Sequence, residues 1–320
     1  MIVVWRVTQQ CNLACPFCEW DRTQPGERLQ IGTERVLRFG QVLADYQRHT
    51  GRRVLLSWLG GEPTLWPPLF DVAPKFKKLG IAQSTTTNGT TLGSAKIRQR
   101  ILENFSELTV SVDGFADFHD RMRGWPGGWQ HIRDAVMALR DSRADPAPLK
   151  LRANIVLMRD NIACLADLCD TLATWGFDEI TFNALGGRDR PEFFPAHHLR
   201  PQDAQALAVL VPELRGRLAS RGVRLCGGDR YVARIVASAQ QERLAVNDCA
   251  PGEQFLFIDE FGRVAPCSFT VATHGLAIED LRSVDDLLKL PAEYAMRRRL
   301  APSAVCEDCP STQVFTKFSV

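Results

Sequence analysis

The stretch "IVVWRVTQQCNLACPFC" (2–18) joins a run of apolar and β-branched residues to a loop that carries three closely spaced cysteines. The run has the composition of a buried β-strand. The loop places Cys11, Cys15 and Cys18 in the pattern C-x3-C-x2-C. Thiolates grouped this tightly bind zinc or iron–sulfur clusters. The stretch therefore predicts a strand that ends directly at a metal site.

This loop offers three thiolates and no suitable fourth ligand nearby. No histidine occurs before His49. The next carboxylates along the chain, Glu19 and Asp21, suit a thiolate-rich zinc site poorly. Catalytic metal centres keep one coordination position free, whereas structural sites are closed. Three ligands therefore indicate a catalytic centre with one open position.

The alternation of strand and helix that begins here continues to about residue 227. Short runs rich in β-branched residues predict strands at 2–8, 53–59, 82–88, 108–113, 151–158 and 179–185. Helical periodicity predicts helices near 33–49, 67–79, 93–105, 129–143, 162–175 and 203–221. Repeated strand–helix units indicate a parallel sheet, because parallel neighbours need a crossover connection. We therefore expect an α/β fold, a partial (β/α)6 TIM-like barrel over residues 1–227.

In such barrels the functional groups lie on the loops that follow the strands. Here those loops are the cysteine loop, "GGEPT" (60–64), "NGT" (88–90) and "DGFADFHDRMRG" (113–124). The pattern changes after residue 227 to a helix near 230–240, a hairpin at 255–267 and a short acidic helix near 283–289. We expect a second, smaller domain over residues 228–320.

That second region carries four more cysteines with the spacing of metal ligands. Cys249 and Cys267 frame C-x12-G-x4-C, with Gly262 at the turn of the predicted hairpin, and Cys306 and Cys309 follow as C-x2-C. Folding the hairpin back on itself would bring the first pair together. Four thiolates form a closed ligand set for an iron–sulfur cluster, and on spacing alone they suit zinc equally well.

The amino-terminal motif, with Phe17 before the third cysteine, resembles the radical S-adenosylmethionine (radical SAM) enzymes. The resemblance implies a 4Fe–4S cluster on Cys11, Cys15 and Cys18, whose free iron is chelated by SAM. In that family the reduced cluster splits SAM into methionine and a 5'-deoxyadenosyl radical, which abstracts hydrogen from an unactivated carbon. The same resemblance implies a set of SAM-binding residues: Phe17, Gly60, Gly61, Glu62, Pro63, Asn88, Ser111 and Asn154. A zinc knuckle or an electron-transfer cluster is the alternative.

The carboxyl-terminal cysteines resemble the SPASM and twitch extensions of these enzymes. No cysteine follows Cys309, which favours the shorter twitch form with one auxiliary 4Fe–4S cluster. By this resemblance its ligands are Cys249, Cys267, Cys306 and Cys309. A fully ligated cluster has no free iron for substrate, so its expected task is to receive an electron. The spacing resembles that of aminocyclitol dehydrogenases.

Together these features predict SAM-dependent radical oxidation of a small polar metabolite, such as an aminocyclitol or a sugar. The alternatives are modification of a ribosomally made peptide and epimerisation with a cysteine thiol as hydrogen donor. Because the first predicted strand begins at Ile2, an amino-terminal peptide-binding domain is not expected. Cys226 is the candidate thiol. Asp113, in a segment similar to the family's S-x-D-G then H-D-x-x-R-G signature, is the other candidate catalytic residue.

Composition excludes several partner classes. Lys and Arg total 39 against 37 for Asp and Glu, so no strong field attracts nucleic acid or an anionic membrane. No run of about 18 apolar residues occurs, and the amino terminus lacks a signal-peptide pattern. Ten cysteines fit a reducing cytoplasm better as ligands than as disulfides. We expect a cytoplasmic protein with a flavodoxin- or ferredoxin-type electron donor, as the resemblance implies.

Overall fold

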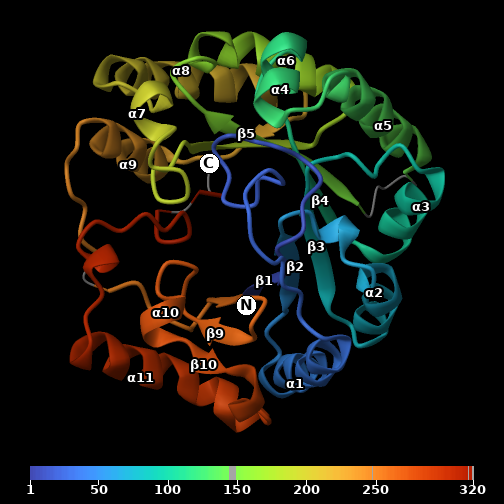
Figure 1. Cartoon of the computed structure of the whole chain (residues 1–320), viewed down its shortest axis with the longest axis vertical. Helices are drawn as coiled ribbons and strands as arrows, with labels where there is room; N and C mark the ends of the chain where they lie inside the picture. Colours follow the sequence, from blue (N-terminus) through green and yellow to red (C-terminus); the bar gives the residue numbers. More distant parts are fainter. Residues whose placement is uncertain (144–148, 247, 316, 319–320) are drawn as a thin grey trace.

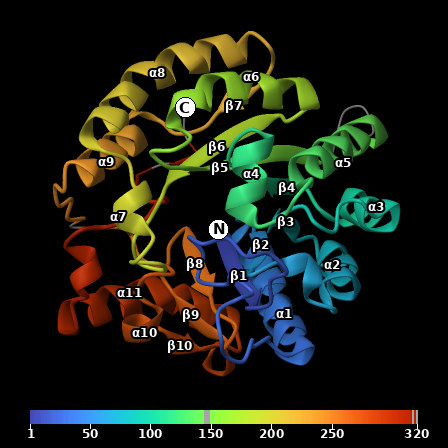
Figure 2. The same ribbon diagram turned by 45° about the horizontal axis from the view of Figure 1, so that its top comes forward.

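The computed structural model describes residues 1–143, 149–246, 248–315 and 317–318. Within these residues one curled sheet of ten strands is lined on its outer side by helices (Figures 1 and 2). The strand order is β10-β9-β8-β1-β2-β3-β4-β5-β6-β7. Pairing is parallel from β8 through β1 to β7, and antiparallel within β8, β9 and β10. Among the described strands, the two at the ends of this order are not paired with each other, so the barrel is open.

The strands are β1 (Ile2–Thr8), β2 (Leu55–Gly60), β3 (Ala82–Thr87), β4 (Glu107–Ser111), β5 (Lys150–Leu157), β6 (Glu179–Ala184), β7 (Arg224–Leu225), β8 (Phe255–Ile258), β9 (Arg263–Ala265) and β10 (Leu276–Ala277). The longer helices are α1 (Thr33–Thr50), α2 (Leu69–Lys78), α3 (Ala95–Asn104), α4 (Ala116–Arg123), α5 (Gly128–Ser142), α6 (Leu165–Trp175), α8 (Pro201–Ala219), α9 (Asp229–Ala239) and α11 (Val284–Leu300). The short helices are η1 (Pro63–Leu65), η2 (Ile162–Cys164), α7 (Phe194–His197), α10 (Val271–His274), η3 (Ile278–Asp280) and η4 (Ala304–Cys306).

The six predicted strands and the six predicted helices between them are all present, and their ends lie within four residues of the expected positions. Their alternating pattern buries one face of each strand under the helices. Trp5 and Trp58 are register partners on β1 and β2 whose rings stack with centroids 6.2 Å apart, and Phe76 of α2 packs edge-on at 5.3 Å from Trp58. Large aromatic rings on the outer face therefore join the helices to the sheet.

The inner face of the sheet is polar. Arg152 on β5 donates to Glu179 Oε2 on β6 at 2.8 Å and to Glu107 Oε2 on β4 at 3.1 Å. All three side chains come from neighbouring strands near their amino-terminal ends. The interior of this barrel is therefore lined by hydrogen-bonding groups on the side of β4, β5 and β6.

The carboxyl-terminal region extends the same sheet. β8 pairs in parallel with β1, with Ile2 opposite Phe255, and β9 and β10 follow it as antiparallel strands. The predicted hairpin is present and turns at Gly262, whose φ is +77°. The short acidic helix expected at 283–289 is wrong in length, because α11 continues to Leu300. The division into domains at residue 227 stays a prediction.

The segment after Cys309, described at residues 310–315 and 317–318 and called here the carboxyl-terminal tail, lies inside the ring of strands and helices. Figures 1 and 2 show it running back toward the inner side of β5 and β6. The Arg152 guanidinium lies 4.9 Å from the Phe318 ring centroid, and Arg224 Nη1 donates to the Phe318 carbonyl at 3.3 Å. None of the described helices is both long and apolar enough to span a bilayer.

Candidate active site

The amino-terminal cysteine loop (residues 9–18) leaves β1 at the carboxyl-terminal edge of the sheet. Cys15 is 5 % exposed, and the three thiols lie close enough for each to influence the charge of the others. Burial raises the pKa of Cys15 to about 11 and that of Cys18 to about 12. Thiols buried in this way are neutral unless a metal stabilises the thiolate. The loop therefore offers three grouped thiols that need a cation to ionise.

The glycines of "GGEPT" let the loop after β2 lie directly on the cysteine loop. A Cβ at Gly61 would stand 2.4 Å from the Gln10 carbonyl oxygen, and one at Gly60 would stand 2.6 Å from that of Thr8. Backbone hydrogen bonds join the same segments, from Gly61 N to Thr8 O at 2.9 Å and from Glu62 N to Gln10 O at 2.7 Å. The resemblance assigned both glycines to SAM binding, and that assignment stays a prediction. In the structure they admit the backbone of the cysteine loop.

Glu62 is a buried carboxylate that organises the loop after β3. Its side chain is fully buried, and this burial raises its pKa. Its Oε1 accepts from Thr87 Oγ1 at 2.8 Å, and its Oε2 accepts from Asn88 N at 2.6 Å. Asn88 in turn points Nδ2 at Cys11 Sγ, 3.7 Å away. The carboxylate that the resemblance assigned to SAM binding thus positions Asn88 through protein contacts. Pro63 follows it and begins η1.

A buried ion pair supports the middle cysteine. Arg123, at the end of α4, donates from Nε to Asp113 Oδ2 at 2.8 Å and from Nη1 to Cys15 Sγ at 3.9 Å. Its guanidinium also lies 5.4 Å from the ring centroid of Phe17. Asp113 Oδ1 accepts from Val156 N at 2.9 Å. Asp113, predicted as catalytic, is therefore engaged in holding Arg123 beside the thiol.

Ser111 and Asn154 are partners in the register of β4 and β5, so their side chains lie side by side. Asn154 Oδ1 accepts from Asn183 Nδ2 of β6 at 3.0 Å and from Lys317 Nζ at 3.2 Å. The predicted SAM-binding residues thus extend as a polar row across the inner face of the sheet. Neither Asn183 nor Lys317 was recognisable from the sequence as part of this row.

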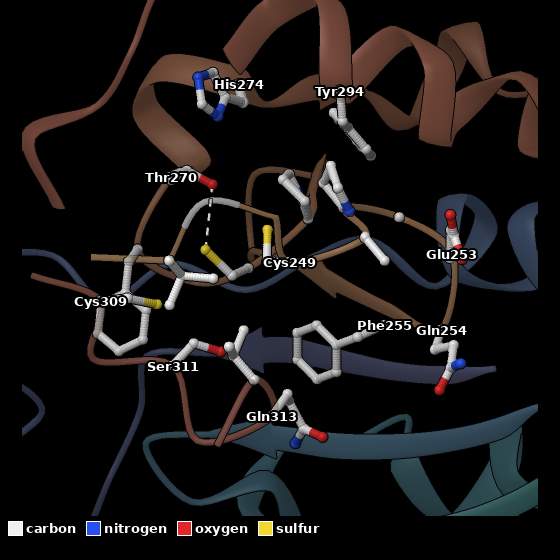
Figure 3. A pocket seen from close by; sticks show the side chains of 18 of the residues that line it. Cys249, Glu253, Gln254, Phe255, Thr270, His274, Tyr294, Cys309, Ser311 and Gln313 are labelled. Atoms are coloured by element: carbon white, nitrogen blue, oxygen red, sulfur yellow. Dashed lines mark hydrogen bonds between the residues drawn. The ribbon is translucent and has the colours of Figure 1, made fainter. Parts of the chain in front are cut away.

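The four carboxyl-terminal cysteines line one cavity of about 680 Å³, the carboxyl-terminal cysteine cavity (Figure 3). Cys267 Sγ lies 3.3 Å from Thr270 Oγ1, and Arg298 Nη1 donates to Cys249 Sγ at 3.7 Å. Phe255 and Tyr294 contribute apolar wall to the same cavity (Figure 3). Burial raises the pKa values of the Cys249 and Cys309 thiols. The structure thus brings together the thiols that the sequence paired by spacing.

Cys226 lies apart from both groups of cysteines. It follows β7, is almost fully buried, and its amide donates to Ile180 O at 2.8 Å. Charges on Glu179, Arg224 and Lys317 influence its thiol, and burial raises its pKa. It is therefore placed on the inner side of the barrel near the carboxyl-terminal tail.

The chemistry of both groups of cysteines suits an iron–sulfur cluster. Each combines several buried or half-buried thiols with an arginine that donates to one sulfur, Arg123 to Cys15 and Arg298 to Cys249. Hydrogen bonds to cluster sulfurs and nearby charge are the means by which proteins tune iron–sulfur centres. Among the residues that the structure describes, no three His, Cys, Asp or Glu side chains are arranged to hold a single metal ion.

An open α/β barrel with three thiols on the loop after its first strand defines a cofactor-dependent barrel enzyme. Residues 5–172, just over half of the chain, match the Radical SAM superfamily, and the chain belongs to it. Membership implies a 4Fe–4S cluster and SAM as cofactors.

Two relatives and one solved structure illustrate the similarity. The AdoMet-dependent heme synthase of Oleidesulfovibrio alaskensis is 23% identical over 84% of this chain and 69% of its own length. The mycofactocin maturase MftC of Mycobacterium tuberculosis is 26% identical over 86% of this chain and 66% of its own length. The structure of Streptococcus suis SuiB bound to precursor peptide SuiA superimposes with a TM-score of 0.69 at 14% identity, over 99% of this chain and 70% of SuiB. The last comparison supports the fold.

The close approach at Gly61 gives a first prediction. We expect Gly61→Ala to destabilise the protein by about 1–3 kcal/mol, because the new methyl group must displace the Gln10 backbone. Iron retention should fall with it, since Gln10 precedes Cys11. Thermal unfolding and iron analysis after anaerobic reconstitution measure both effects. Gly216→Ala is the matched control, because a Cβ added at Gly216 would meet no atom within 4 Å, and it should leave iron content unchanged.

Proposed function

We propose that this radical SAM enzyme modifies a carbon–hydrogen bond of a ribosomally made peptide. The observation that carries the proposal is similarity to a peptide maturase over 86% of the chain. The relatives favour this alternative over the small polar metabolite that the sequence predicted. A tetrapyrrole substrate is the second candidate, supported by the heme synthase relative.

In this proposal Cys11, Cys15 and Cys18 hold the cluster that binds SAM. When bound, the reduced cluster and SAM supply a carbon-centred radical that removes a hydrogen atom from the substrate. Asn88 and Arg123 donate toward two of the thiols, which stabilises their negative charge. SAM would lie along the polar row formed by Ser111 and Asn154, beside the cysteine loop.

The carboxyl-terminal cysteine cavity would hold an auxiliary 4Fe–4S cluster. Cys249, Cys267, Cys306 and Cys309 are its proposed ligands, and a cluster with four protein ligands suits electron transfer. Residues 228–320 would then form the auxiliary domain, attached to the barrel through β8. We propose a flavodoxin- or ferredoxin-type protein as the external electron donor.

Anaerobic reconstitution tests the proposal. Wild-type protein should bind about eight irons, and Cys306→Ala/Cys309→Ala should bind about four. The double variant should still form deoxyadenosine from SAM and dithionite, because the amino-terminal cysteine loop is intact. It should lose formation of oxidised product. A zinc-only protein, or equal iron in both proteins, would contradict the auxiliary site.

Product analysis distinguishes the substrate classes. The enzyme should be incubated with SAM, dithionite and candidate precursor peptides encoded beside the gene, and separately with iron tetrapyrroles. Deoxyadenosine that appears only with peptide, together with a mass change in that peptide, supports the first candidate. A loss of two hydrogens indicates oxidation, whereas deuterium incorporated from solvent indicates epimerisation with a thiol such as Cys226.

A further inference from the structure

The carboxyl-terminal tail places a lysine ammonium against the inner face of the barrel sheet. Lys317 Nζ donates to Asn154 Oδ1 on β5 at 3.2 Å and to Asn183 Oδ1 on β6 at 2.9 Å. The Asn183 oxygen also accepts from the Tyr231 hydroxyl at 3.2 Å. The ammonium is thus fixed at a defined point beside two strands of the barrel.

The tail is fixed on both sides of this lysine. Lys317 N donates to Thr312 O at 3.0 Å, which closes a turn in the tail. On the other side, the Phe318 carbonyl and ring contact Arg224 and Arg152, as described above. These contacts hold the lysine at the inner face of the sheet.

The positive charge of Lys317 has no anionic partner among the described residues. Its two acceptors are neutral amide oxygens. Two carboxylates of the inner face, Glu107 and Glu179, already pair with Arg152. An ammonium that is 7 % exposed and lacks a counter-ion is costly.

The titratable groups around Lys317 do not supply a negative charge that would balance its ammonium. Burial lowers the pKa of the Lys317 ammonium to about 7, and the charge of Arg152 acts in the same direction. The thiol of Cys226 is the group that acts in the opposite direction, and burial raises its own pKa. A bound anion would therefore stabilise Lys317 in its charged form.

A second polar group on the same face of the sheet lacks a hydrogen-bond partner. Thr181 on β6 is 1 % exposed, and its Oγ1 has no hydrogen-bond partner among the described residues. Thr181 is the register partner of Asn154, so it lies one strand away from the amide that holds Lys317. Asn154 and Asn183 are both partly exposed, whereas Lys317 and Thr181 are buried, so a ligand would approach them along the two asparagines.

We propose that Lys317 and Thr181 form a subsite that binds a carboxylate of the substrate. Lys317 supplies the charge and its third N–H, Thr181 donates its hydroxyl hydrogen, and Asn154 with Asn183 orients the ammonium. This inference rests on the proposed function and specifies the part of the substrate that enters the barrel. The carboxylate can belong to an acidic side chain, to a peptide carboxyl terminus or to another organic acid.

Small probes test the subsite without the complete substrate. The reconstituted protein with SAM should be titrated with N-acetylglycine, with the α-amide of N-acetylglutamate, and with uncharged N-acetylglycinamide. Saturation-transfer NMR measures binding. We expect at least one carboxylate probe to bind about tenfold more tightly than the amide, because a charged hydrogen bond discriminates by that amount. Tighter binding of N-acetylglycine would identify a peptide carboxyl terminus as the source of the carboxylate. Tighter binding of the α-amide of N-acetylglutamate would identify an acidic side chain.

Variants test whether the preference for carboxylate over amide probes depends on the carboxyl-terminal tail. Lys317→Met, which keeps the length of the side chain, should remove the preference, whereas Lys317→Arg should retain part of it. Asn183→Asp leaves the lysine in place and adds a carboxylate beside Nζ, so it should also remove the preference. Lys289→Met, at an exposed position on α11, is the matched control and should bind the probes as the wild type does.

Two results would overturn the inference. One is equal binding of carboxylate and amide probes to the wild type, or no measurable binding of either. The other is a carboxylate preference that persists in both Lys317→Met and Asn183→Asp. Iron content and substrate-free deoxyadenosine formation should be measured on every protein. If the wild type fails these two assays the proposed function is wrong, and the probe results still decide the subsite.

Discussion

Cys15→Ala is expected to lose about four irons and to reduce deoxyadenosine formation to background, because two thiolates cannot hold a cluster that needs three. Cys15 is the most buried of the three thiols in its loop, and it also accepts from Arg123. Iron and sulfide analysis after anaerobic reconstitution measures the first effect. Chromatography of the reaction with SAM and dithionite measures the second.

Cys164→Ala is the matched control for this experiment. Cys164 is exposed, lies at the end of η2 and belongs to neither group of cysteines. Its replacement should change neither iron content nor deoxyadenosine formation. Full iron in Cys15→Ala would show that the amino-terminal cysteine loop is not a cluster site.

Arg123→Met is expected to cost about 3–5 kcal/mol of unfolding free energy, because it leaves the buried Asp113 carboxylate without its partner. The same change removes a positive charge beside Cys15. The midpoint potential of the amino-terminal cluster should therefore fall, since a nearby cation stabilises the added electron. Urea unfolding measures the stability, and a redox titration followed by electron paramagnetic resonance measures the potential.

The double variant Asp113→Asn/Arg123→Met separates these two effects. Removing both charges should recover part of the stability, since no uncompensated ion stays buried. The midpoint potential should stay below that of the wild type but fall less than in the single variant, because the Asp113 charge, which acts on Cys15 in the opposite direction, is also removed. A single variant as stable as the wild type would show that the ion pair has little structural importance.

The fold could be predicted from sequence because its signal is local. Runs such as 2–8 and 151–158 carry strand composition, and the helices between them carry helical periodicity, so each element could be recognised by itself. The pairing of β8 with β1 is different, because about 250 residues separate the partners. Strand composition predicts that a strand exists, and tertiary packing decides which strand it joins.

That seven of the cysteines form two groups could be predicted, because their spacing alone groups them. The residues that support them could not. Arg123 was visible in the sequence as part of a polar loop, but its contact with Cys15 depends on α4, a helix that the sequence did not predict. Lys317 gave no signal, since a single lysine near a chain end is ordinarily solvated. Only the path of the tail shows that it lies inside the barrel.

The pairing of β8 with β1 also connects the two groups of cysteines. Met1 and Ile2 line the carboxyl-terminal cysteine cavity, and the other end of β1 leads into the amino-terminal cysteine loop. A strand of this length spans about 20 Å and bends little when it is paired on both sides. β1 therefore acts as a rigid spacer. An electron exchanged between the two sites would travel a distance that the paired strand fixes and that no hinge motion changes.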